Sequence, residues 1–380
     1  MAAAREQAGN KREHGAEAPG VADAPFASHE VRLTAGQWVV AALLVAVASV
    51  LLPRLWERAE PFAPGPDYRM PYELSSDYWH FSRYARAAAA EGKVLVVGDS
   101  VVWGQYVGRH ETLAQCLNEL AGTPRFANLG VDGMHPAALA GLIAHYGRPI
   151  AGRRVLLHCN PLWMSSKRHD LRIEKEFHFN HPELVPQFFP AIPCYRASVS
   201  DRLAIVVQRW LPAFAWADHL RLVYYDGRDV PSWTIEHPYR CPLGALTGAL
   251  PGPGDEPRHE PVPWTEKGMP RQDFPWVGLS ESLQWRSFRQ LVGVLQGRGN
   301  RLFVLVGPFN EHMATEESSA RYRRLRDGIV AWLAAEGVAH YAPAALSSRL
   351  YADASHPLAE GYGTIARDLF ESPPFAPFRP

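Results

Sequence analysis

The stretch KVLVVGDSVVWG, residues 93–104, places an uninterrupted run of apolar residues directly before a glycine, an aspartate and a serine. Such a run predicts a short strand that is buried on both faces, as in a parallel sheet. Downstream, we expect further strands at RFANL, RRVLLHC, RLFVLVG and VAHYAP, separated by segments of helical periodicity. Strands that alternate with helices predict an α/β fold, with a doubly wound, mainly parallel sheet flanked by helices.

An apolar segment near the N-terminus predicts a membrane anchor. The segment WVVAALLVAVASVLL, Trp38 to Leu52, contains one serine and no charged residue, and Trp38 and Trp56 bracket it as interfacial anchors do. We therefore expect a transmembrane helix at residues 35–55, with a buried core helix and a cleavable signal sequence as the alternatives. Arginine residues lie on both sides of this segment, so the charges do not set its orientation.

The remaining sequence divides around this anchor. Residues 1–34 are rich in Ala, Glu, Gly, Lys and Arg without apolar periodicity, which predicts a disordered tail. Residues 56–92 are expected to form a juxtamembrane linker and helix, and residues 93–380 a globular domain. Proline, tryptophan and histidine accumulate at about residues 165–277, so we expect a long insertion there, with a helix at SVSDRLAIVVQRWL.

Composition excludes several classes of function. The 39 basic residues balance the 39 acidic residues, so no net field would attract nucleic acid. The four cysteines form no C-x-x-C pair, and we expect no metal and no cofactor. His178 and His181 lack a third ligand in the sequence pattern. Cys194 and Cys241 both lie in the insertion, and whether they pair in an oxidising compartment stays open.

Ser100 is the candidate nucleophile. It follows the first predicted strand directly, and open α/β sheets place their active sites at this carboxyl edge. A serine hydroxyl needs a general base, and the base needs an orienting group. The pattern D-x-x-H supplies both, and Asp353 and His356 lie in a loop after the last predicted strand, which returns them to the same edge. We therefore expect Ser100, Asp353 and His356 to form a catalytic triad.

The same pattern occurs twice more in the chain. Asp77 and His80 lie on the helix predicted before the first strand, and we interpret them as a polar helix face. Asp132 and His135 lie in the second strand-to-helix loop, where turn and helix-cap roles explain them. They remain the reserve pair.

Two segments supply candidates for an oxyanion hole. NLGVDG, residues 128–133, contains glycines that let the backbone approach a ligand and donate N–H groups. HCNP, residues 158–161, offers the side-chain amide of Asn160. The aromatic residues Trp163, Trp264, Trp276 and Phe309 predict either a sugar-stacking platform or, as we favour, a small core of the insertion.

The order GDSVVWG, NLGVDG, CNP and DASHP resembles the four blocks of the SGNH (GDSL-like) hydrolase family, over about residues 93–160 and 301–370. The resemblance implies an SGNH/flavodoxin-like fold, the triad Ser100, Asp353 and His356, and an oxyanion hole made by Ser100, Gly133 and Asn160. The third block departs from the usual G-x-N-D, because Cys159 precedes Asn160 and Pro161 follows it.

That departure is similar to a membrane-anchored branch. CNPLWM, LFVLVGPFN and the N-terminal anchor are similar to the D-alanyl transfer protein of teichoic acid alanylation, and in general plan to proteins that O-acetylate exopolysaccharides with a membrane-bound O-acyltransferase. The resemblance implies a single-pass membrane protein with an extracytoplasmic catalytic domain, and such an acyltransferase as partner. The expected function is that of a serine esterase or O-acyltransferase acting on acyl esters, chiefly acetyl esters, of cell-envelope carbohydrate. A non-catalytic envelope scaffold or carbohydrate-binding protein on the same fold is the alternative.

Overall fold

The computed structural model describes residues 33–379, so all but the last two residues of the expected disordered tail lie outside it. The chain divides into two compact units between Ala48 and Ser49. Helix α1 (Ala35–Ala59) runs across this division and extends four residues past the predicted anchor. Its 25 residues correspond to about 37 Å, against about 30 Å for a bilayer's hydrocarbon core. Helix α1 is thus long and apolar enough to cross a membrane.

The second unit is built on a five-stranded sheet that is parallel throughout. Its strands are β1 (Val94–Gly98), β2 (Phe126–Gly130), β3 (Arg154–Cys159), β4 (Arg301–Val306) and β5 (Ala339–Tyr341). They lie in the order β2-β1-β3-β4-β5, with Val97 opposite Leu129 on one side and Leu157 on the other. This is a doubly wound order, whose direction reverses between β1 and β3. The sequence-based prediction of an α/β fold with a parallel sheet is confirmed.

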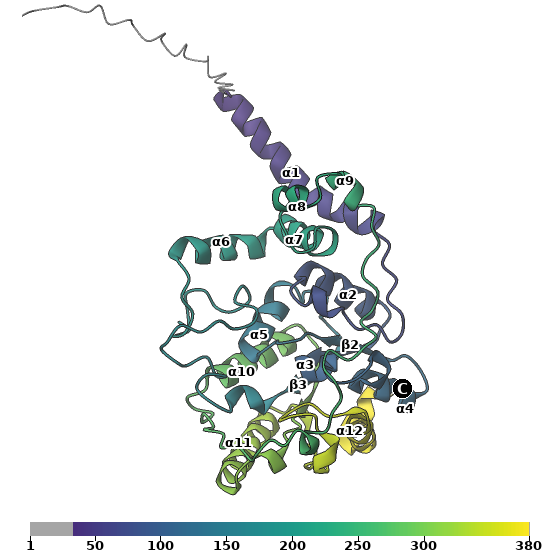
Figure 1. The fold of residues 1–380 in the computed structure, drawn as a ribbon, viewed down its shortest axis with the longest axis vertical. Helices are drawn as coiled ribbons and strands as arrows, with labels where there is room; N and C mark the ends of the chain where they lie inside the picture. The colour runs from purple at the N-terminus through teal and green to yellow at the C-terminus, as the bar shows by residue number, and fades with distance from the viewer. Residues whose placement is uncertain (1–32, 380) are drawn as a thin grey trace, which may run out of the picture. The chain divides into compact units, whose positions relative to one another are not determined.

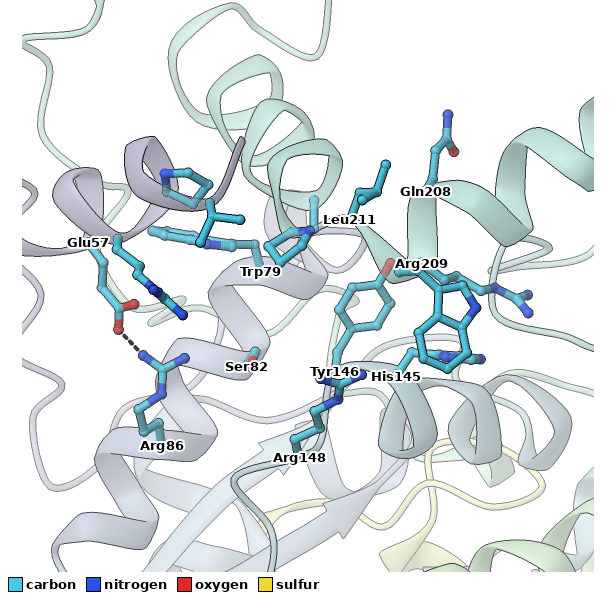
Figure 2. Close-up of a pocket in the computed structure, with 16 residues that line it drawn as sticks. Glu57, Trp79, Ser82, Arg86, His145, Tyr146, Arg148, Gln208, Arg209 and Leu211 are labelled. Atoms are coloured by element: carbon cyan, nitrogen blue, oxygen red, sulfur yellow. Dashed lines mark hydrogen bonds and ion pairs between the residues drawn. The ribbon is translucent and has the colours of Figure 1, made fainter. Parts of the chain in front are cut away.

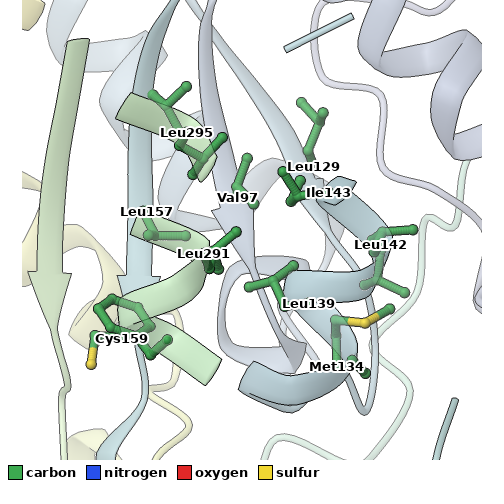
Figure 3. Packing of buried hydrophobic residues seen from close by; sticks show 14 of the residues in the cluster. Val97, Leu129, Met134, Leu139, Leu142, Ile143, Leu157, Cys159, Leu291 and Leu295 are labelled. Carbon is green, nitrogen blue, oxygen red and sulfur yellow. The ribbon is translucent and has the colours of Figure 1, made fainter. Parts of the chain in front are cut away.

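Helices cover both faces of the sheet (Figure 1). One face packs against α2 (Tyr78–Ala90), α5 (Pro136–His145), α10 (Leu283–Gly297) and α11 (Glu316–Ala335). The other packs against α3 (Ser100–Trp103), α4 (Leu113–Ala121) and α12 (Ala359–Glu371). Figure 3 shows Leu139 and Ile143 of α5 and Leu291 and Leu295 of α10 gathered over Val97. Continuous burial on both faces explains why the strands are apolar throughout.

The predicted domain boundary at residue 93 falls inside this compact unit. Helix α2 precedes that boundary, yet Phe81, Tyr84 and Ala85 are buried in the main core. Asp77 and His80, interpreted from the sequence as a polar helix face, are both buried, so they do not form a solvent-exposed face of α2. Asp77 caps α2 by accepting the N–H of His80, and its carboxylate also receives Nδ1 of His219 at 2.6 Å.

The insertion at Ser165 to Val277 is largely irregular around four helices. These are α6 (Val199–Trp210), as predicted, and α7 (Pro212–Tyr224), α8 (Val230–Glu236) and α9 (Pro242–Ala245). Cys194 is buried and Cys241 is exposed, and both are free thiols, as are Cys116 and Cys159. The pairing left open for Cys194 and Cys241 is therefore not formed. Trp264 and Phe309 are buried and Trp276 packs against Phe309, so they are core residues, but they belong to the core on the α12 face of the sheet and not to a small core of the insertion.

Candidate active site

Ser100 is placed by a tight turn at the carboxyl end of β1. Strand β1 ends at Gly98, Asp99 caps α3 by accepting the N–H of Val101, and Ser100 is the first helical residue. Helix α3 then packs directly on β2, since a side chain at Gly130 would place its Cβ 2.3 Å from the backbone nitrogen of Trp103. The strand order reverses between β1 and β3, and the turn that carries Ser100 lies at the carboxyl end of β1 beside this point. Sheets of this kind usually bind their ligands there.

The three side chains selected from the sequence lie in one hydrogen-bonded series. The Ser100 hydroxyl donates to Nε2 of His356 over 2.8 Å. The Nδ1–H of His356 faces both carboxylate oxygens of Asp353, each at 2.9 Å. Because Nδ1 carries the proton toward the carboxylate, Nε2 is left with the lone pair that accepts the serine proton. This is the arrangement that nucleophilic catalysis by serine needs.

The loop that carries Asp353 and His356 is fixed by backbone contacts. The carboxylate of Asp353 accepts the N–H groups of Ser355 and His356 at 2.9 and 3.0 Å. Asn310, which follows β4, donates its backbone N–H to the carbonyl of Ala354 and its side-chain amide to that of Asp353. These bonds hold the imidazole in the orientation that its contact with Ser100 requires.

Charges around the imidazole tune its basicity. Burial on its own lowers the pKa of His356, but the charge and hydrogen bond of Asp353 outweigh burial and raise that pKa above its usual value. Burial likewise raises the pKa of Asp353, and the charge of His356 with the hydrogen bonds to its carboxylate reverses this, so the pKa lies well below its ordinary range. Asp353 is therefore ionised at neutral pH, and His356 is a stronger base than a free imidazole.

The expected oxyanion donors border the same cavity. Ser100, Gly133, Asn160 and His356 line a cavity of about 240 Å³. As the first residue of α3, Ser100 has an N–H with no intrahelical acceptor. One amide hydrogen of Asn160 goes to Asp99 at 2.7 Å, which leaves the second hydrogen of the same nitrogen for a ligand. Gly133 adopts φ +67°, which favours glycine.

Asp99 is a buried carboxylate that accepts hydrogen bonds from three side chains, a role that was not predicted from the sequence. Its carboxylate receives Nδ1 of His158 at 3.0 Å, the amide of Asn160 and the indole N–H of Trp163 at 2.8 Å. Burial raises its pKa, but the charge and hydrogen bond of His158 with the other donors lower it to about 2. Asp99 thus anchors Asn160 beside Ser100. The signal was present, because His158 lies near the end of β3, the strand next to β1, and Asn160 directly follows β3.

Further polar groups line the cavity from other segments. Asp132 carries an Oδ1 atom that is buried without a hydrogen-bond partner among the described residues, and burial raises the pKa of this carboxyl group. Asn180 and His169 reach the cavity from the insertion, and Trp163 lines it as well. The irregular insertion gave no periodic signal that would place Asn180 or His169 here. Of the four aromatic residues considered for a sugar-stacking platform, Trp163 is the one that lines this cavity.

Of the reserve pair, His135 takes the helix-cap role expected of it, whereas Asp132 lines the Ser100 cavity. His135 caps α5 by accepting the N–H of Ala138, and its Nε2 lies 3.2 Å from the carbonyl oxygen of Asn180. His181 is buried between Tyr78 and the carbonyl of Asp132, while His178 is exposed. Within residues 33–379, no group of three or more His, Cys, Asp or Glu side chains is arranged to hold a metal ion.

Comparisons with known proteins add no identification. No protein-family model matches the chain, and no curated protein matches it.

Proposed function

We propose that the protein is a serine esterase or O-acyltransferase that works through an acyl-Ser100 intermediate. The observation that carries this proposal is the continuous series from Ser100 through His356 to Asp353. A serine hydroxyl within 2.8 Å of an imidazole that is itself oriented by a carboxylate is an activated nucleophile. Ser100 and Asn160 line the same cavity, and the N–H of Ser100 and the second amide hydrogen of Asn160 could donate to an oxyanion there, which supports acyl chemistry.

In the first half-reaction, the Ser100 oxygen attacks the carbonyl carbon of an ester while its proton moves to Nε2 of His356. The carbonyl oxygen becomes an oxyanion, which the N–H groups of Ser100 and Gly133 and the amide of Asn160 stabilise. The tetrahedral intermediate then collapses, the carbon–oxygen bond to the alcohol breaks, and His356 returns the proton to the leaving alkoxide. Asp353 stays ionised throughout and stabilises the imidazolium that forms.

In the second half-reaction, an acceptor O–H attacks the acyl-serine. His356 takes the acceptor's proton, the bond to Ser100 breaks, and His356 returns a proton to the Ser100 oxygen. Water as acceptor makes the protein a hydrolase, and a substrate hydroxyl makes it a transferase. Asp132 lines this cavity, and we propose that its carboxylate accepts a hydrogen bond from a substrate hydroxyl.

The substrate class follows from the size and polarity of the cavity. A cavity of about 240 Å³ is small beside the roughly 300–1,000 Å³ of drug-sized sites, which favours a short acyl group such as acetyl. Asp132, Asn180 and His169 supply the polar partners that a carbohydrate hydroxyl needs. We place the SGNH-like domain outside the cytoplasm, anchored by α1 in the membrane, acting on envelope carbohydrate with a membrane-bound O-acyltransferase as partner.

The test is an acyl-partition assay on the full-length protein in detergent. With 4-nitrophenyl acetate, wild type should release 4-nitrophenol, and an added envelope oligosaccharide should become acetylated if the protein is a transferase. Ser100→Ala should lower release by roughly 10⁴-fold or more. Ser280→Ala, at an exposed serine, is the matched control. Release that is equal in wild type and Ser100→Ala, with retained binding of the oligosaccharide, would instead support a carbohydrate-binding protein.

A further inference from the structure

A second cavity, of about 250 Å³, is separate from the cavity at Ser100. It is formed by the C-terminal part of α1, by α2, by the end of α5 and by the junction of α6 with α7, and it shares no lining residue with the Ser100 cavity (Figure 2). All of these residues belong to the compact unit that begins at Ser49. This cavity has no role in the proposed acyl chemistry.

The lining of this cavity is strongly basic. Arg54, Arg86, Arg148 and Arg209 line it, and Glu57 is its one acidic lining residue. Figure 2 shows Arg86, Arg148 and Arg209 spaced around the cavity, with Arg86 paired to Glu57. Such a surplus of guanidinium groups favours a phosphate or another oxyanion.

Few acidic groups among the described residues neutralise these charges. Within residues 33–379, Arg54 and Arg148 have no ion-pair partner, and both are exposed. Arg209 donates to the backbone carbonyls of Glu183 and Val185, which leaves its charge uncompensated. His145, in the same lining, has its pKa lowered to about 4 by burial and by the charges of Arg209, Arg148 and Arg298. The positive potential is thus concentrated on one spot.

Helix α6, beside this cavity, is amphipathic, but its apolar side chains face outward and its arginines face the domain. Its arginines turn toward the domain: Arg202 donates to the carbonyl of Tyr195 at 2.8 Å, and Arg209 to that of Glu183. Its apolar side chains turn outward along one stripe, and Val199, Leu203, Val207 and Trp210 are 66, 52, 52 and 66% exposed. An exposed apolar stripe with basic residues beside it is the pattern of a helix that lies in a membrane interface.

The exit of α1 is fixed against the same region. Glu60, directly after α1, receives Nε2 of His219 at 2.9 Å and the hydroxyl of Tyr224 at 2.6 Å, and it pairs with Arg83. Trp56 packs against Tyr224 of α7, with ring centroids 5.8 Å apart. The C-terminal part of α1, within this unit, is therefore held beside α7, and α7 follows α6 directly.

From these observations we propose that the cavity binds the phosphate head group of an anionic phospholipid. Arg54 and Arg148 bind the phosphate oxygens, and the acyl chains leave along Val50, Trp210 and Leu211, which line the same cavity. We place the apolar stripe of α6 in the interfacial layer of the leaflet that holds this lipid. Bound lipid would thus fix how the catalytic domain is held over the membrane surface.

The test is native mass spectrometry of the full-length protein released from detergent with added phosphatidylglycerol or phosphatidylcholine of identical acyl chains. Wild type should retain phosphatidylglycerol in preference to phosphatidylcholine. The double variant Arg54→Gln/Arg148→Gln should bind phosphatidylglycerol roughly thirtyfold more weakly, with phosphatidylcholine unchanged. Arg324→Gln, at an exposed arginine of α11, is the matched control and should behave as wild type. An unchanged melting temperature and unchanged labelling of Ser100 would show that the double variant is folded.

Three outcomes would overturn the proposal. One is equal retention of the two lipids by wild type, and another is a double variant that keeps the wild-type preference. The third is displacement of phosphatidylglycerol by inorganic phosphate at equal concentration, since a free anion lacks the acyl chains that Trp210 and Leu211 contact. As a second measurement, Leu203→Ser/Val207→Ser should weaken retention of both lipids, because it removes the apolar stripe and leaves the arginines in place.

Discussion

Ser100 and His356 are 256 positions apart in the sequence, and the Ser100 hydroxyl nevertheless lies 2.8 Å from Nε2 of the imidazole. The contact exists because β1 and the loop before α12 both end at the carboxyl edge of one parallel sheet. It is a long-range contact between two short loops, so the scaffold must be formed before the nucleophile is activated.

The first prediction concerns pH. His356 must be neutral to accept a proton, so kcat/KM for 4-nitrophenyl acetate should rise with pH through a pKa above the usual value of about 6.5. Asp353→Asn removes the charge that raises this pKa. We expect the rising limb to move to lower pH and the limiting rate to fall by roughly 10⁴-fold. A variant limb that stays at the wild-type pH would show that Asp353 does not set the basicity of His356; Asp327→Asn serves as control.

The second prediction concerns Gly133. An alanine Cβ there would lie 2.1 Å from Nδ2 of Asn180, and the backbone has φ +67°. Gly133→Ala should lower kcat by about 10²–10³-fold by displacing an oxyanion donor. Gly122→Ala is a matched control, because its φ is +65° and nothing lies within 4 Å of its Cβ. Equal activity of the two variants would exclude Gly133 from the oxyanion hole.

The third prediction concerns the stability that Asp99 provides. Its carboxylate pairs with His158 in the core, so Asp99→Asn should lower the free energy of unfolding at pH 7 by about 3–5 kcal/mol. A carboxyl pKa lowered from 3.8 to about 2 stabilises the fold above pH 3.8, and this contribution is lost as the pH falls through 2. The difference between wild type and variant in chemical unfolding should therefore shrink from pH 5 toward pH 2. A difference that is constant with pH would contradict the assignment.

The fourth prediction concerns His219, whose contribution to stability is lost as the pH rises and not as it falls. His219 lies between Glu60 and Asp77, and their hydrogen bonds and charges outweigh burial and raise its pKa to about 9. This stabilisation is complete below pH 6.5 and is lost as the pH rises through 9. His219→Gln should cost about 3–5 kcal/mol at pH 6 and less above pH 9, as measured by chemical unfolding. His178→Gln, at an exposed histidine, should show no such pH dependence.

The sheet and the candidate triad were predictable because their signals are local. Each strand is a short apolar run, and the alternation of strands with helices returns Ser100 and His356 to one edge without knowledge of any contact. The stripe Phe81, Tyr84, Ala85 and Ala88 was also present in the sequence, at helical spacing. It marks α2 as a core helix, although it precedes the predicted domain boundary.

The remaining contacts could not be derived from local pattern. Asp77 is paired with His219, which lies 142 positions away in the irregular insertion. Asn180 reaches the cavity from the same insertion, where no periodicity indicates which side chains point inward. Contacts of this kind depend on how segments far apart in the sequence meet in three dimensions, and local periodicity does not encode that.

The most direct test of the central claim is covalent labelling of the full-length protein with a fluorophosphonate probe, followed by intact-mass and peptide mass spectrometry. An activated Ser100 predicts one adduct per chain on the peptide that contains Ser100, with labelling lost in Ser100→Ala and in His356→Ala and retained in Ser280→Ala. An adduct that persists in Ser100→Ala, or a folded wild type that is not labelled at all, would contradict the assignment of Ser100 as the nucleophile.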